Sequence, residues 1–88
     1  MFEFDKMKSL AKEQKHGLNF EEAQALWQRP SIMLRSQYPE EERWLLIAEY
    51  KNVYWAAIFT YREDNIRIIS VRKARDNEKK YFAQQKIK

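Results

Sequence analysis

The stretch that decides the fold is Asn65–Arg75, which reads Asn-Ile-Arg-Ile-Ile-Ser-Val-Arg-Lys-Ala-Arg. Its β-branched residues predict a core strand, and its regularly placed guanidiniums predict a cationic face on that strand. In strict alternation neither face is purely apolar. One extra residue at Ile68-Ile69, a β-bulge, would turn Ile66, one of these two isoleucines and Val71 toward the core. The same bulge would bring three polar side chains together on the opposite face: Arg67, Ser70 and Arg72. Because bulges often lie beside functional sites, this strand is the first place to look for one.

Composition places the chain among small globular domains. It has 88 residues, of which 44% are hydrophobic and 15% aromatic, enough for one core and too many for a disordered chain. The absence of cysteine excludes disulfides, thiolate metal sites and cysteine nucleophiles. There is no apolar run of 18 residues and no signal-peptide core, so we expect a soluble cytoplasmic protein without a membrane partner.

Positive charge is concentrated near the end of the chain. Residues 1–61 contain 8 Lys and Arg against 9 Asp and Glu, whereas residues 62–88 contain 9 against 4. A basic surface of this kind attracts nucleic acid, an acidic protein or anionic lipid. The alternative is a solvated charged tail.

The flanking sequence predicts three helices. The first covers residues 6–16, between the N-cap Asp5 and the C-terminal Gly17, and its apolar stripe includes Met7 and Leu10. A second helix is expected over residues 20–28, after a capping box formed by Asn19 and Glu22. The last is expected over residues 78–85, capped by Asp76 or Asn77.

Strands are expected at residues 31–35, 43–50, 53–61 and in the opening stretch, with a short edge strand within residues 1–4. Lys51-Asn52 and Glu63-Asp64 are predicted turns, and residues 36–42 an exposed acidic loop. The fold class is therefore α+β, with two N-terminal helices on one face of a mostly antiparallel sheet of three to five strands, and a C-terminal helix. The other face is expected to be free.

Few side chains are suited to catalysis. His16 is the only histidine, which argues against a two-histidine ribonuclease and against a zinc site, and it is also well placed as a simple helix-dipole partner. No carboxylate cluster suggests a metal, and one glycine is too few for a phosphate loop or dinucleotide motif, so neither metal nor cofactor is expected. What remains is cationic. Arg62, Arg67 and Arg72 recur every five residues, a spacing suited to holding phosphates, although each is equally compatible with an ordinary exposed arginine.

Six blocks in chain order carry a resemblance to a known family: Phe2-Glu3-Phe4-Asp5-x-x-Lys8, Lys15-His16-Gly17-Leu18-x-Phe20-Glu21-Glu22-Ala23, Glu42-Arg43-Trp44-Leu45-x-Ile47, Thr60-x-Arg62, Ile66-Arg67-Ile68-Ile69-Ser70-x-Arg72-x-Ala74 and Glu78-x-x-Tyr81. Together they resemble the BrnT toxin family. The resemblance implies one BrnT-like domain over residues 1–88 with a RelE-like ribonuclease fold. It also implies a bacterial type II toxin-antitoxin pair, whose BrnA-type antitoxin is a ribbon-helix-helix protein and is the only route to operator DNA.

For a metal-free ribonuclease that uses the 2′-hydroxyl of RNA as nucleophile, the protein must supply a base, an acid and positive charge. We expect Arg72 with Arg67 or Arg62 to hold the phosphate, His16 or Lys8 to close the site, and Glu49 or His16 to act as base. The further expected phosphate or RNA contacts are Arg43, Arg62, Ser70 and Arg75. An RNA base could stack on Tyr38, Tyr61 or Tyr81, although core packing is the simpler role for most aromatics here.

Two other classes stay open. A catalytically weak or inactive homologue would use the same basic face to bind RNA or the antitoxin. A DNA-binding regulator acting alone is disfavoured, because no helix-turn-helix with a basic recognition helix is evident.

Overall fold

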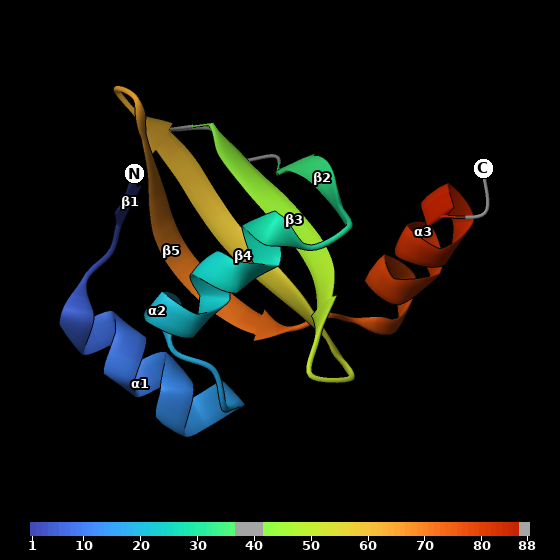
Figure 1. Ribbon diagram of the computed structural model, residues 1–88, viewed down its shortest axis with the longest axis horizontal. Coiled ribbons are helices and arrows are strands. Elements are labelled where there is room, and N and C mark those ends of the chain that lie inside the picture. Colours follow the sequence, from blue (N-terminus) through green and yellow to red (C-terminus); the bar gives the residue numbers. More distant parts are fainter. Residues whose placement is uncertain (37–41, 87–88) are drawn as a thin grey trace.

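The computed structural model describes residues 1–36 and 42–86, which form one five-stranded sheet with helices on both sides (Figure 1). The elements in chain order are β1 (Phe2–Glu3), α1 (Lys6–His16), α2 (Phe20–Ala23), the 3₁₀ helix η1 (Gln24–Gln28), β2 (Ser31–Ser36), β3 (Arg43–Tyr50), β4 (Val53–Arg62), β5 (Asn65–Lys73) and α3 (Asp76–Lys86). The α+β class is confirmed. No helix in the described part of the chain is long and apolar enough to cross a bilayer. The predicted loop at 36–42, with Tyr38, falls largely outside the described residues.

Helix α1 begins and ends where its capping residues predict. The Asp5 carboxylate accepts hydrogen bonds from the backbone N–H groups of Met7 and Lys8 at 2.8 and 3.1 Å. At the other end Gly17 has φ 91°, and its N–H donates to the carbonyl of Glu13 at 2.7 Å. A left-handed residue of this kind stops a helix, and glycine adopts it without strain.

The other helical segments differ from the prediction at their ends. Asn19 caps α2 as expected, accepting from the N–H of Glu22 at 2.8 Å, but the α-helix lasts one turn and continues as η1. The predicted second α-helix is therefore right only at its start. Helix α3 begins two residues earlier than predicted. Arg75 is its N-cap, because the Arg75 carbonyl accepts the first helical bond from Lys79 at 2.9 Å.

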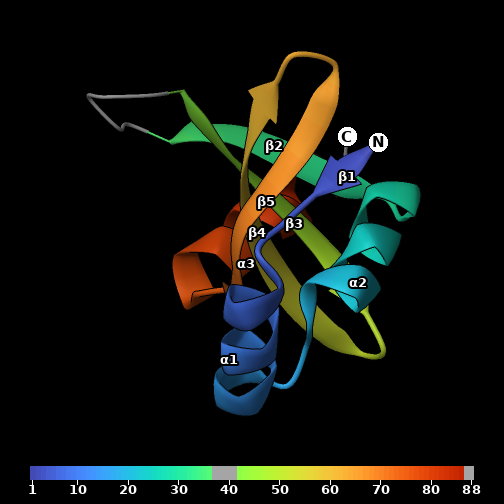
Figure 2. The same ribbon diagram turned by 90° about the vertical axis from the view of Figure 1, so that its left-hand side faces the viewer.

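The strands form a four-stranded antiparallel meander with β1 added at one edge, in the order β1-β5-β4-β3-β2. Both predicted turns are present, and Lys51 and Asn52 both have positive φ, as a two-residue hairpin turn requires. β1 pairs in parallel with the beginning of β5, joining Glu3 to Arg67 (Figure 2). The sheet therefore has the predicted edge strand, and this strand places Glu3 beside Arg67 of β5.

The predicted bulge is present. Ser70 lies opposite Ile58 and Ile68 lies opposite Phe59, so Ile69 has no partner on β4. This extra residue lets Ile68 and Val71 both point into the core, where each is at most 2% exposed. Arg67, Ser70 and Arg72 are thereby collected on the other side of the strand.

One face of the sheet is covered by α2, η1 and the segment before them. Phe20, Leu26 and Phe59 are fully buried there, and Trp27 packs edge-on against Phe59 at 5.1 Å. Ser9 is the residue that α1 buries, and its Oγ accepts a hydrogen bond from the N–H of Phe20 at 2.9 Å. The predicted apolar stripe of α1 is wrong as a packing face, because Met7 and Leu10 are 75% and 55% exposed.

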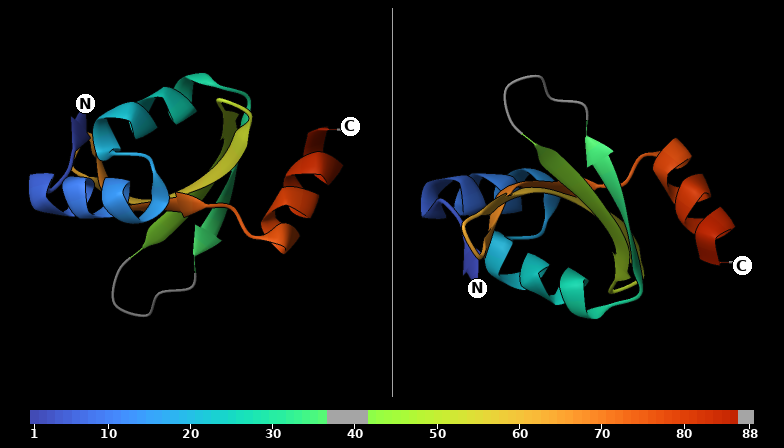
Figure 3. Two further views of the ribbon diagram at one scale, coloured as in Figure 1. Left: turned by 90° about the horizontal axis from the view of Figure 1, so that it is seen from below. Right: turned by 90° about the horizontal axis from the view of Figure 1, so that it is seen from above.

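The opposite face is not free, which corrects the prediction that all helices share one face. The sheet separates α3 from α2 and η1, while α1 packs beside β5 (Figure 3). Phe82 of α3 is buried with Ile47, Ala56 and Ala74, and its ring lies 5.4 Å from that of Tyr54. The reason is that β3 and β4 carry apolar side chains on both faces, and this second apolar surface also needs a cover.

Candidate active site

The candidate site lies on the α3 side of the β4–β5 hairpin. We call Arg62, Arg67, Ser70 and Arg72 the arginine face, because the strand register places all four on one side of the sheet. Arg67, Ser70 and Arg72 lie opposite Thr60, Ile58 and Ala56 of β4, and Arg62 lies opposite Asn65. The predicted grouping of Arg67, Ser70 and Arg72 is confirmed as geometry. Counting the bulge, Arg67 and Arg72 are about 13–16 Å apart along the strand.

Both central arginines are held by a carboxylate from another part of the chain. Arg67 Nη1 lies 3.6 Å from Glu3 of β1, with each side chain about one third exposed. Arg72 is held far more tightly, since its Nη1 and Nη2 donate to the two carboxylate oxygens of Glu78, each at 2.8 Å. Glu78 belongs to α3 and is only 8% exposed. Carboxylates from β1 and α3 therefore orient the two arginines.

Glu78 was missed by sequence reasoning, although a signal for it exists. Its Oε1 also accepts a hydrogen bond from the backbone N–H of Arg75 at 2.8 Å. A glutamate three residues after the N-cap that reaches back to the N-cap N–H is half of a capping box. The spacing of Arg75 and Glu78 could have placed the helix start, but it could not have named Arg72 as the second partner.

The Arg72–Glu78 pair is ionised. The hydrogen bonds from Arg72 hold the pKa of the Glu78 carboxyl below its usual value, against burial, which would raise it, and the Arg75 backbone N–H acts in the same direction as Arg72. The bond to Glu78 likewise raises the pKa of the Arg72 guanidinium. Glu78 is therefore a poor general base, because a base must take up a proton near the working pH.

His16 ends α1, which packs beside β5 (Figure 1), and it lies close enough to Arg72 for the guanidinium charge to affect its imidazole. Burial lowers the pKa of its imidazole, and the positive charges of Lys12, Lys15, Arg72 and Lys73 lower it further. This direction favours the uncharged ring, which can accept a proton, over the imidazolium form that a helix-dipole role would use.

The other predicted catalytic residues, Lys8 and Glu49, form no hydrogen bond or ion pair with Arg72 in the described part of the chain. Lys8 is two turns before His16 on α1, roughly 12 Å along the helix. Glu49 shares the sheet face but lies on β3, opposite Tyr54 and roughly 12 Å from Arg72 by strand spacing and rise. The aromatic pair of Tyr54 and Phe82 occupies the same end of this face. Glu49 is thus poorly placed to act as the base in an Arg72 site.

The remaining predicted contacts surround the arginine face at different distances. Arg62 is exposed at the end of the hairpin, and Arg75 is exposed at the start of α3, near enough to Glu78 to lower the pKa of its carboxyl. Arg43 begins β3 on the same sheet face. Tyr81 is 41% exposed on α3. Tyr61 is 53% exposed and lies on the opposite sheet face, where its ring packs 5.6 Å from that of Phe59.

Comparison with known proteins gives one family. Residues 4–78 match the model of the ribonuclease toxin, BrnT, of type II toxin-antitoxin systems. The chain belongs to the BrnT family. A comparison with curated proteins gave no match. Membership in this family makes RNA the substrate class and an antitoxin the protein partner.

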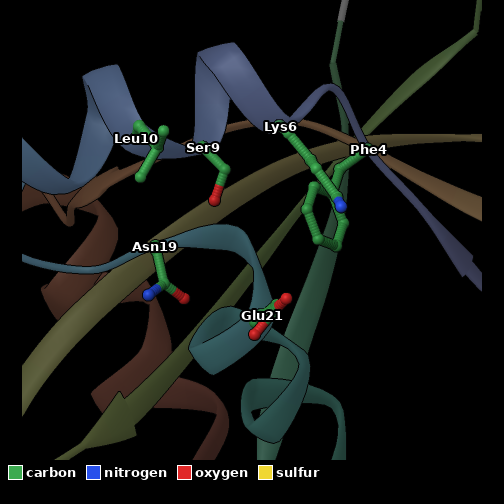
Figure 4. Close-up of a pocket in the computed structure, with 6 residues that line it drawn as sticks. All are labelled: Phe4, Lys6, Ser9, Leu10, Asn19 and Glu21. Atoms are coloured by element: carbon green, nitrogen blue, oxygen red, sulfur yellow. The ribbon is translucent and has the colours of Figure 1, made fainter.

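The matched part of this BrnT-family chain contains the whole arginine face and His16, and its last residue is Glu78. A cleft of about 260 Å³ lies elsewhere, between the first turns of α1 and the start of α2. Ser9 and Leu10 line one side of it, and Asn19 and Glu21 the other (Figure 4). None of the arginine-face residues lines this cleft. The arginine face is thus a charged sheet surface and not a cleft, and such a surface suits an extended polyanion better than a small ligand.

Proposed function

We propose that this chain is the toxin of its pair and acts as a metal-independent endoribonuclease with a RelE-like fold. The observation that carries the proposal is the bulge at Ile69, because it gathers Arg67, Ser70 and Arg72 on one side of β5, with His16 close enough to Arg72 to feel its charge. In this proposal the toxin acts in the cytoplasm. A BrnA-type ribbon-helix-helix antitoxin neutralises it and provides its only link to operator DNA.

The reaction is an attack of the RNA 2′-hydroxyl on the adjacent phosphorus. The O2′–P bond forms and the P–O5′ bond breaks, leaving a 2′,3′-cyclic phosphate and a 5′-hydroxyl. His16 takes the proton of the 2′-hydroxyl, and the departing 5′-oxygen receives a proton from water. A positioned base of this kind contributes about 10²–10⁴-fold to the rate.

Positive charge does the remaining work. The non-bridging oxygens of the phosphate gain negative charge in the transition state. In this proposal Arg72 donates hydrogen bonds to these oxygens, while Arg67, about 13–16 Å away along the strand, holds another phosphate of the same RNA. One pre-positioned donor to developing charge is worth about 10²–10³-fold in rate. Ser70 lies between the two arginines and can donate a further hydrogen bond.

The pairing of both arginines with carboxylates favours a second candidate function. Glu3 and Glu78 already offset much of the positive charge, which weakens the stabilisation of a phosphorane-like transition state. A homologue that binds RNA or the antitoxin without turnover fits this charge balance.

Incubation of RNA with the purified chain, free of antitoxin and in EDTA, distinguishes these functions. We expect cleavage to fragments ending in a 2′,3′-cyclic phosphate, a loss of about 10²–10⁴-fold in rate with His16→Ala, and no change with Lys80→Ala on the exposed side of α3. RNA that is bound and left intact supports the binding module. Cleavage that disappears only when EDTA is added contradicts the metal-free mechanism.

A further inference from the structure

The Arg72–Glu78 contact leaves one edge of the guanidinium unused. A guanidinium has five N–H bonds, arranged in a flat fork. Arg72 uses three of them: Nη1 donates to Glu78 Oε1 at 2.8 Å and to the carbonyl of Lys73 at 3.2 Å, and Nη2 donates to Glu78 Oε2 at 2.8 Å. The two that remain are on Nε and Nη2, side by side along one edge. Neither has a partner among residues 1–36 and 42–86.

This free edge has the geometry that binds a phosphate through two oxygens. Two parallel N–H bonds on one side of the plane match the spacing of phosphate oxygens, and such bidentate pairs are stronger and more directional than a single contact. Lysine cannot present this arrangement, because its ammonium is a point charge on a flexible chain. The side chain of Arg72 is 21% exposed, so it is mostly enclosed but keeps some access to solvent.

Glu78 is itself firmly placed. Its carboxylate receives the Arg75 backbone N–H at 2.8 Å, and its position in the first turn of α3 is anchored by the burial of Phe82 at 4% exposure one turn later. Restriction of the guanidinium by such a support removes rotamer freedom before RNA binds, which lowers the entropy cost of reaching the transition state.

We propose that Glu78 is a positioning residue, which holds Arg72 by one edge so that the Nε–Nη2 edge is presented to the scissile phosphate of RNA. The inference rests on the proposed nuclease function. In this scheme α3 contributes to the site through Glu78, which orients Arg72 and does not itself contact the substrate. Removal of the Glu78 carboxylate raises the local positive charge and at the same time frees the guanidinium to move. The effect of orientation on the rate can therefore be distinguished from the effect of charge.

Steady-state kinetics on an RNA oligonucleotide in EDTA test the proposal with Glu78→Gln, Glu78→Asp and Asp76→Asn. Gln removes the charge and sets an N–H group against Nη2, while Asp keeps the charge and shortens the reach. We expect both Glu78 variants to lower kcat by roughly 10- to 100-fold while KM changes by less than about threefold. Asp76→Asn is the matched control, since it removes the same charge from the same turn of α3 at a side chain that is 96% exposed. It is expected to leave kcat unchanged.

A folded Glu78→Gln protein with the kcat of the wild type overturns the proposal, as does an equal loss of kcat in Asp76→Asn, which would indicate a general charge effect. A second measurement needs no variant. In ¹⁵N-labelled wild-type protein, the Nε–H resonance of Arg72 should shift when an oligonucleotide with a single 2′-deoxy substitution at the cleavage site binds. Binding without that shift overturns the proposal. A shift without any cleavage of the all-ribose RNA supports the presented edge and instead contradicts the proposed nuclease function.

Discussion

Replacement of Arg72 by methionine tests how strongly the arginine face depends on α3. The change leaves the Glu78 carboxylate, whose side chain is 10% exposed, with the Arg75 N–H as its remaining hydrogen-bond donor. Removal of one partner of a fully buried ion pair costs about 3–5 kcal/mol, and because Arg72 keeps one fifth of its side chain exposed we expect about 2–4 kcal/mol. That is a large share of the roughly 5–15 kcal/mol that stabilises a domain. A loss of RNA cleavage in an Arg72 variant therefore needs a stability measurement beside it.

Urea unfolding of a double-mutant cycle measures this dependence. Arg72→Met combined with Glu78→Met replaces the pair by apolar side chains, and we expect the double variant to unfold within about 1 kcal/mol of the wild type. The matched control is Arg67→Met, on the same strand and face. Its partner Glu3 is 3.6 Å away and both side chains are about one third exposed, so its loss should cost less than about 1 kcal/mol. Equal costs for Arg67→Met and Arg72→Met, or strictly additive changes in the cycle, would refute the reasoning.

The same pair gives stability a predictable pH dependence. Because the folded-state pKa of Glu78 lies below the unfolded value, the pair contributes fully above that unfolded value and loses its contribution as the pH falls through the folded value. The difference in unfolding free energy between wild type and Arg72→Met should therefore shrink below about pH 4. A difference that stays constant down to pH 2 would show that the ionised carboxylate is not the source of the effect.

Substitutions at Ser9 and Gly17 test the supports of the site, and a pH profile tests His16. Ser9→Ala leaves the buried N–H of Phe20 without its acceptor and should cost about 1–3 kcal/mol in urea unfolding; a cost below 0.5 kcal/mol would contradict the role of this bond. Gly17→Ala places a Cβ where no atom lies within 4 Å, so its cost should be the left-handed backbone strain alone, about 1–2 kcal/mol, with Gly17→Asn milder. If His16 is the base, kcat/KM should fall as the pH drops through a pKa below the usual value of about 6.5, matching the value found for His16 by NMR titration; an acid limb above that value would exclude it.

Much of the local structure follows from the sequence alone. The two ends of α1 are set by Asp5 and Gly17, and the hairpin turn by Lys51 and Asn52, because capping and positive φ act within a few residues. Even the bulge could be predicted. A strand that carries Arg67, Ile68, Val71 and Arg72 cannot satisfy a buried face and a cationic face without one extra residue.

Only the tertiary structure decided which side chains contact the arginines of β5. The deciding stretch predicts that Arg67 and Arg72 share a face, but it does not name their partners, Glu3 of β1 and Glu78 of α3. Glu3 is distant in the sequence, whereas Glu78 follows Arg72 by only six residues and meets it because α3 packs against the same side of the sheet. For the same reason Glu49, a candidate base by residue type, lies two strands from Arg72, while His16 is brought near it by the packing of α1 along β5. Short-range stereochemistry thus specified the cationic strand, and long-range packing selected the partners that give its arginines their orientation.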